Sequence, residues 1–346
     1  MSELLSERCE SILHTVISEY ILTGNPVGSR TISKKLNAGL SPASIRNVMV
    51  DLEEMGFLCQ PHTSAGRVPT NEGLRYYVDC ILEVRKLSKE EKNSIERRYS
   101  PSDYEIINIM EETSRLLSKT SRYTGIVLAP SFDNIIFEHI ELIKLRNDRI
   151  LTVFVSKEGM IHNKVIRSEE QLSQDDLHKF SKYLNEILRD LSLRDARKKI
   201  IAEVKRDRIT YNQLLSKALE LSQKALLDTD REAGLYINGK CNMFECPEFR
   251  HMEKMKTIFQ AFEEKSVLIE LLDQVMEEEG IQIFIGTENQ FQEMQECSIV
   301  VSPYTWKNCV MGTLGVIGPV RMNYCDVVPI VDYTARTVSR IMDSCY

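Results

Sequence analysis

A short stretch near the amino terminus gathers side chains that can read DNA. Ser44, Arg46 and Asn47 follow the pair Ser41-Pro42, which is typical of the start of a helix. Hydroxyl, guanidinium and amide groups at a helix N-terminus can hydrogen-bond base edges in the major groove and hold phosphates. We therefore expect Ser41 to cap a recognition helix, and Ser41, Ser44, Arg46 and Asn47 to face the DNA.

Two flanking segments are suited to the DNA backbone. Residues 26–30 read Pro-Val-Gly-Ser-Arg, so Ser29 can cap a short helix that carries Arg30 in its first turn. Residues 61–70 read Pro-His-Thr-Ser-Ala-Gly-Arg-Val-Pro-Thr, a basic, proline-bracketed hairpin with its turn expected at Gly66. We expect His62 and Arg67 in this hairpin to contact phosphates rather than bases, with the Arg67 guanidinium able to reach the minor groove.

Apolar spacing predicts the elements that position these groups. Apolar residues that recur at steps of three and four predict a first helix: Cys9, Ile12, Leu13, Val16, Ile17, Tyr20 and Ile21. Gly24 and Pro26 end this helix. The next two helices bury Ile32 and Leu36, and then Ile45, Met49 and Leu52. A strand at 57–59 and a helix capped by Thr70 or Asn71 follow. This order predicts a winged helix-turn-helix.

The charge distribution supports DNA binding locally. The chain is acidic overall, with a net charge of −7. Residues 20–50 nevertheless contain four cations and no acid, and residues 55–71 are also free of acids. Phosphate binding requires only a basic face. A solvated helix surface, or a winged helix used only for protein contact, remains open on charge alone.

Three groups of motifs resemble the family of the heat-inducible transcription repressor HrcA. They lie at 40–47 with 61–70, at 242–244, 247–249 and 262–265, and at 314–319, 321–324 and 331–335. The chain departs from the family pattern at Val48 and Val50, and at residues 305–308, where the role of the loop that contains Trp306 is left open.

The resemblance implies an α+β, multidomain fold. It comprises a winged helix-turn-helix at 1–90, a discontinuous GAF-like α/β domain at 100–148 and 232–346, and an inserted α+β dimerisation domain at 149–231. The sequence is compatible with this, since β-branched runs predict strands at 123–129, 135–145, 150–156, 281–285, 298–301 and 309–317. The polar stretch 86–102 resembles a linker, and residues 173–228 and 248–279 have helical patterns.

The resemblance also implies a function. A homodimer would repress chaperone genes by binding an inverted-repeat operator in double-stranded DNA. A GroEL-type chaperonin would keep this repressor active. A helical stripe in the expected insert supplies candidate dimer contacts, unless it packs only on its own domain: Leu177, Phe180, Leu184 and Leu188. The alternative is a metabolite-sensing regulator that acts through the GAF-like domain.

Other chemistry finds little support. The nine cysteines are odd in number and unevenly spaced, so we expect reduced thiols and a cytoplasmic protein. No apolar run is long enough to span a bilayer. Cys241, Cys246 and His251 are too widely spaced for a typical zinc site, and the glycines at 312, 315 and 318 lack the Lys-Ser/Thr of a phosphate loop. We expect no enzyme activity, metal or cofactor.

Overall fold

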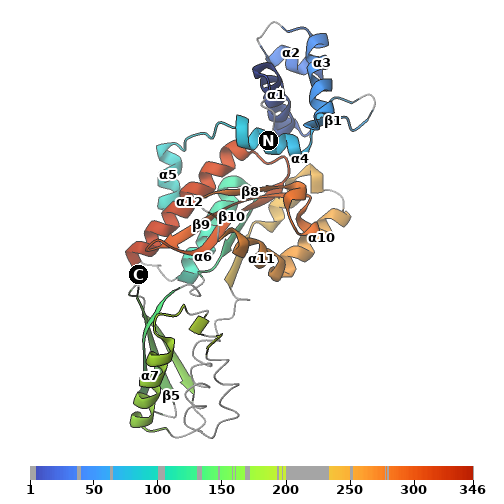
Figure 1. Ribbon diagram of the computed structural model, residues 1–346. Coiled ribbons are helices and arrows are strands. Elements are labelled where there is room, and N and C mark those ends of the chain that lie inside the picture. The colour runs from blue at the N-terminus through green and yellow to red at the C-terminus, as the bar shows by residue number, and fades with distance from the viewer. Residues whose placement is uncertain are drawn as a thin grey trace. The chain divides into compact units, whose positions relative to one another are not determined.

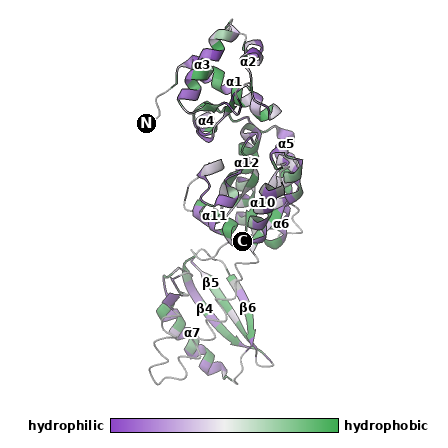
Figure 2. Ribbon diagram, turned by 90° about the vertical axis from the view of Figure 1, so that its right-hand side faces the viewer, coloured by the Kyte–Doolittle hydropathy of each residue, from purple (hydrophilic) through white to green (hydrophobic). Residues whose placement is uncertain are grey.

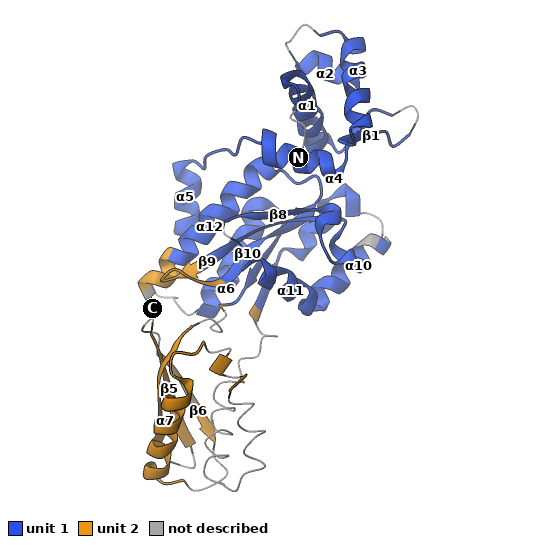
Figure 3. Cartoon of the chain, in the orientation of Figure 1, with its two compact units in different colours: residues 1–129, 235–304, 312–339 blue, residues 130–234, 305–311, 340–346 orange. Residues whose placement is uncertain are grey.

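The computed structural model divides the chain into two compact units (Figure 3). Unit 1 comprises residues 1–129, 235–304 and 312–339, and unit 2 comprises residues 130–234, 305–311 and 340–346. The residues described are 5–36, 40–62, 65–99, 106–130, 135–146, 149–157, 159, 161–167, 172–192, 195–196, 198–199, 234–249, 252–276, 278 and 280–345.

The amino-terminal part of unit 1 is a winged helix-turn-helix (Figure 1). Its helices are α1 (Glu7–Thr23), α2 (Ser29–Lys35), α3 (Pro42–Glu54) and α4 (Asn71–Tyr76), and α4 continues into a π-helical turn, η1 (Tyr77–Ile81). Strands β1 (Leu58–Cys59) and β2 (Val68–Pro69) pair antiparallel. The expected stripe on α1 is confirmed by the burial of Ile12, Leu13, Val16 and Ile17, and Gly24 ends the helix in the left-handed conformation.

Two of the expected caps are present and one is not. The Ser41 hydroxyl accepts a hydrogen bond from the backbone N–H of Ser44 at 3.1 Å, and that of Thr70 accepts from Gly73 at 3.0 Å. Ser29 was expected to cap α2 but is its first residue. The cap position is Gly28, which has no side chain to offer.

The rest of unit 1 is built on a five-stranded sheet in the order β7-β3-β10-β9-β8. Its strands are β3 (Thr124–Leu128), β7 (Leu235–Asn238), β8 (Gln282–Ile285), β9 (Cys297–Trp306) and β10 (Cys309–Pro319). The helices are α5 (Lys89–Glu96), α6 (Ile106–Ser121), α10 (Met252–Glu263), α11 (Lys265–Val275) and α12 (Tyr324–Cys345), and short 3₁₀ turns are η3 (Lys240–Glu245), η4 (Pro247–Phe249), η5 (Gly286–Glu288) and η6 (Gln292–Met294). This is the GAF-like α/β arrangement that was expected. The stretch 86–102, expected to be a linker, contains α5 because Ser88 and Glu91 form a capping box.

Helices cover both faces of this sheet (Figure 1). Ile126 of β3 and Ile299 of β9 belong to the apolar core that includes Phe262 of α10 and other residues of α10 and α11. The alternate residue of β9, Ser298, bonds instead to the Tyr324 hydroxyl of α12 at 2.7 Å. On β3, Gly125 lies so close to α6 that a Cβ would overlap the Ser114 carbonyl.

Unit 2 contains a three-stranded antiparallel sheet, β4 (Phe137–Lys144), β5 (Arg149–Ser156) and β6 (Ile161–Arg167), and helix α7 (Gln174–Leu188). β4 pairs with β5 and not with the five-stranded sheet. Residues 137–144 therefore lie in unit 2, whereas the expected insert begins at 149. The expected helical pattern at 201–228 lies outside the described residues.

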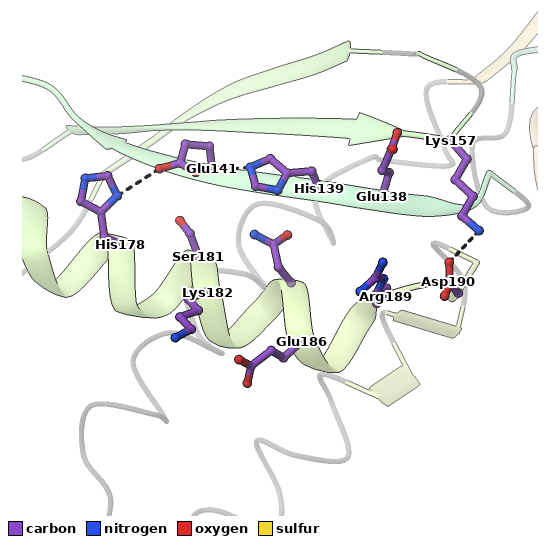
Figure 4. Close-up of a pocket in the computed structure, with 11 residues that line it drawn as sticks. Glu138, His139, Glu141, Lys157, His178, Ser181, Lys182, Glu186, Arg189 and Asp190 are labelled. Atoms are coloured by element: carbon purple, nitrogen blue, oxygen red, sulfur yellow. Dashed lines mark ion pairs between the residues drawn. The ribbon is translucent and has the colours of Figure 1, made fainter.

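Side chains of α7 bond to the free edge of β4. The Asn185 amide accepts from Ile140 N–H at 2.8 Å and donates to the Ile140 carbonyl at 3.0 Å. Leu142 N–H donates to the Ser181 hydroxyl at 3.0 Å, and the Gln174 amide donates to the Leu142 carbonyl at 3.2 Å. Figure 4 shows Ser181 directed from α7 toward β4. These bonds satisfy backbone groups that an edge strand otherwise leaves unpaired.

The two faces of this sheet differ. Ile140, Ile150, Phe154 and Ile166 lie in the core with α7. The strand registers place six apolar residues on the other face, where none is fully buried: Ile143, Leu151, Val153, Val155, Ile161 and Val165. Figure 2 shows the hydropathy along β4, β5 and β6. Ile161 is 68% exposed and Val165 is 51% exposed. We refer to these six residues as the outer face of unit 2.

Candidate nucleic-acid interface

Helix α3 presents the side chains that were expected to read DNA. Its inner side is buried and consists of Ile45, Val48, Met49 and Leu52. Arg46 and Asn47 are exposed, whereas Ser44 is half-buried and its hydroxyl accepts from that of Ser41 at 3.1 Å. Arg46 and Asn47 are therefore free to contact bases, and Ser44 acts within the cap.

Helix α2 supports α3 in the arrangement of a helix-turn-helix. The Ser33 hydroxyl donates to the Leu40 carbonyl at 3.1 Å and so ties α2 to the residue just before α3. Arg30 and Lys34 are exposed on α2, whereas Lys35 pairs with Glu19 of α1. Two cations of α2 thus remain available to phosphates.

The wing is anchored by an isolated β-bridge between Val27 and Arg67. Val27 and Arg67 exchange two backbone hydrogen bonds of 2.8 and 2.9 Å, which extends the β1–β2 pair. Gly66 was expected to form the turn of the hairpin. It lies instead against Val27, where a Cβ would overlap the Val27 carbonyl. Its lack of a side chain therefore permits close approach of two backbone segments.

The two basic residues of the wing differ in their surroundings. His62 is exposed near the tip, as expected for a phosphate contact. Arg67 forms an ion pair with Glu53 of α3 at 2.7 Å, and its side chain is only 15% exposed. In this arrangement the Arg67 guanidinium holds the wing against α3, and the phosphate contact expected of it stays a prediction.

The same ion pair influences a neighbouring thiol. Burial raises the pKa of the Cys59 thiol, the Glu53 carboxylate raises it further, and Arg67 opposes both effects. Cys59 therefore stays protonated at neutral pH. This part of the wing carries no thiolate to repel phosphates.

Helix α4 contacts the five-stranded sheet domain through polar side chains. The Arg75 Nε donates to Glu288 at 2.7 Å, and the same guanidinium bonds to the Ile283 carbonyl. The Asn71 amide donates to the Thr287 hydroxyl at 3.0 Å. Sequence reasoning missed these residues because their partners lie more than two hundred positions away along the chain, at separations of 208 to 216.

The stripe expected to form a dimer is buried within unit 2. Leu177, Leu184 and Leu188 have no exposed surface and Phe180 is 4% exposed. All four pack with β4, β5 and β6 of the same chain. Their apolar surface is therefore occupied, as in the alternative in which the stripe packs only on its own domain.

Within the described part of the chain, no group of three His, Cys, Asp or Glu side chains is arranged to hold a metal ion. His251, the third member of the widely spaced Cys-Cys-His set, lies outside that part. None of the described helices is both long and apolar enough to span a membrane.

Comparisons with known proteins identify the family. Residues 108–328 match the family described as "HrcA protein C terminal domain". The chain is 47% identical to the heat-inducible transcription repressor HrcA of Geobacter sulfurreducens, with 98% of each chain covered, and 40% identical to that of Syntrophobacter fumaroxidans, also with 98% of each covered.

A solved structure, titled "Crystal structure of a hypothetical protein at 2.2 A resolution", shares the fold. It has a TM-score of 0.58 and is 21% identical over 99% of both chains. Together with a winged helix-turn-helix that exposes Arg46 and Asn47, these matches show that the chain belongs to the HrcA family of heat-inducible transcription repressors, a class of non-enzymatic regulators.

Proposed function

We propose that this protein represses chaperone genes as a dimer that binds an inverted-repeat operator through α3 and the wing. The observation that carries the proposal is the exposure of Arg46 and Asn47 on a capped helix whose first turn has no acidic residue. Arginine and asparagine form paired hydrogen bonds with guanine and adenine edges, respectively. His62, Arg30 and Lys34 add cations that fit the flanking phosphates.

Replacement of Arg46 by alanine tests the readout. One lost base contact costs about 1–3 kcal/mol, so operator affinity should fall by about tenfold or more, with a smaller loss on scrambled DNA. Arg336→Ala removes an arginine that is 74% exposed on α12 and serves as the matched control. Fluorescence anisotropy measures the affinity for each duplex and so the ratio of operator to scrambled-DNA affinity. Equal losses on the two duplexes would show that α3 does not read the sequence.

An inverted repeat requires a two-fold partner, since each half-site must meet the same protein surface. We infer that the outer face of unit 2 is the dimer surface, because it is the apolar side of the sheet that α7 leaves uncovered. Covering one exposed Ile or Val stabilises an interface by about 1.5–3 kcal/mol, and two-fold symmetry counts each residue twice.

Sedimentation of Ile161→Asp distinguishes this surface. We expect monomers at concentrations at which the wild type is dimeric. Ile107→Asp is the control, because Ile107 is 60% exposed, close to the 68% of Ile161, but lies on α6. A dimer that survives Ile161→Asp but not Ile107→Asp would place the interface in unit 1.

Chaperonin dependence is the third part of the proposal. The five-stranded sheet is complete only when its edge strand β7 pairs with β3, and most of unit 2 lies between these two strands in the chain. Such long-range pairing slows folding and exposes strands that a chaperonin can bind. Operator binding by refolded protein should therefore rise across a titration with a GroEL-type chaperonin at fixed temperature. Full binding without chaperonin, retained after mild heating, would favour the metabolite-sensing alternative.

A further inference from the structure

A groove runs along α1 on a side of the winged helix that the DNA-reading helix does not use. It has a volume of about 650 Å³. The α1 residues that line it include Glu7, Ser11, His14, Ser18 and Ile21. They lie four, three, four and three positions apart, so they form one continuous face along the helix.

The shape of this lining fits an elongated ligand. The lining spans α1 from its first residue to Leu22, which is roughly 22 Å at 1.5 Å per residue. Ser11 and Ser18 lie one heptad apart and are small, so they leave holes into which side chains of a second helix can insert. A compact ligand would occupy only part of this length.

The opposite wall comes from the segment after α4. Tyr77 and Ile81 of η1 line the groove, together with Leu82, and π-helical turns such as η1 occur frequently at functional sites. The Tyr77 ring lies 5.7 Å from that of His14 across the groove. Leu22, at one end, is 71% exposed. The walls therefore offer apolar surface to a partner.

The charge of the lining indicates which kind of partner is complementary to the groove. Glu7, Glu10 and Glu83 lie along the groove, and its lining contains no lysine or arginine among the described residues. Glu7 and Glu83 are exposed, and Glu10 accepts a hydrogen bond from the Tyr76 hydroxyl at 2.7 Å. A groove with one apolar wall and carboxylates along it is complementary to a helix that carries apolar residues on one face and cations beside them.

We propose that this groove is a docking site for a cationic amphipathic helix of a partner protein. The site is separate from the proposed operator contacts on α3 and does not depend on them. It joins α1 of the winged helix to Asn323 and Cys325 at the start of α12, which also line it.

Two labelled 21-residue model peptides test the proposal on the full-length protein. Both carry leucine at the a and d positions of three heptads; one has lysine at e and g and the other has glutamate. We expect the lysine peptide to bind at least about tenfold more tightly by fluorescence anisotropy, and its affinity to fall as salt is raised. Equal affinity of the two peptides, or binding of neither, would overturn the proposal.

Variants locate the binding. Ser11 is exposed, so Ser11→Trp should fill the groove without loss of folding and weaken the lysine peptide about tenfold. The double variant Glu7→Gln, Glu83→Gln should also weaken it, and Glu263→Gln, Glu264→Gln, with the same change in net charge on exposed residues, should not. Equal losses of peptide affinity in the two double variants would refute the assignment. It would also be refuted if Ser11→Trp alone changed the sedimentation of the protein, because this would indicate that a second copy of the chain occupies the groove.

Discussion

Replacement of Arg67 by alanine separates two roles for the cation of the wing. The change removes an ion pair with Glu53 whose N–O distance is 2.7 Å and whose side chains are 15% and 31% exposed. A hydrogen bond to a charged group contributes about 1.5–3 kcal/mol, and the partial hydration of Glu53 reduces this value. We therefore expect the free energy of unfolding to fall by about 1–2 kcal/mol, as measured by chemical denaturation.

The effect of Arg67→Ala on DNA binding should have a particular form. Because the guanidinium bonds to Glu53 and not to a phosphate, its removal loosens the wing and weakens DNA binding. The number of counterions released when the protein binds DNA stays the same. The slope of log K against log salt should therefore stay constant, whereas loss of a phosphate contact flattens it by about one. Anisotropy titrations at four or more salt concentrations measure this slope.

Glu53→Gln is the matched control, since it breaks the same ion pair and keeps the cation. It should lower stability by a similar amount, and the double variant should lose less than the sum of the two single variants. A slope that flattens by about one in Arg67→Ala and not in Glu53→Gln would refute the reasoning. It would mean that Arg67 leaves Glu53 and neutralises a phosphate on binding.

Three further predictions follow from packing and charge. Gly66→Ala should destabilise the wing by about 1–3 kcal/mol, measured by denaturation, because a Cβ would overlap the Val27 carbonyl; a wild-type midpoint would contradict this. Leu184→Asp should cost at least about 3 kcal/mol and unfold the sheet of unit 2, and a monomer with unchanged circular dichroism would argue against it. The hydrogen bond from Arg85, and to a smaller extent that from the Ser88 N–H, lowers the pKa of Glu91 from 4.5 to about 2. The contribution of Glu91 to the stability of the fold is therefore present above pH 4.5 and lost as the pH falls toward 2. Glu91→Gln should remove that part of the acid dependence in a pH series of melting curves, and an unchanged series would refute the pairing.

Local patterns predicted the parts of the structure that depend on local forces. The stripe on α1, the left-handed Gly24 that ends it and the Thr70 cap follow from interactions within a few residues. The outward direction of Arg46 and Asn47 follows from the burial of Ile45 and Met49 on the same helix.

Contacts between distant segments were not predictable in this way. An amphipathic stripe shows that Leu184 is buried but not what buries it, and the sheet of its own chain proved to be the partner. The β-branched run at 137–144 could equally pair with either sheet. The sequence shows that Arg67 carries a positive charge beside a turn, but its ion pair with Glu53 became visible only in the three-dimensional structure.

The side chains that α7 places along β4 have a consequence for polymerisation. A foreign strand that approached this edge would first have to displace Asn185 and Ser181 from Ile140 and Leu142, and would lose several hydrogen bonds before it gained one. Growth of the sheet by repeated strand addition, which is the geometry of fibrils, is opposed at this edge. In the dimer proposed above, two chains that meet through the outer face of unit 2 would instead form a closed pair, because each one would cover the surface that the other uses. Unit 2 can thus expose apolar residues for pairing while β4 resists open-ended assembly.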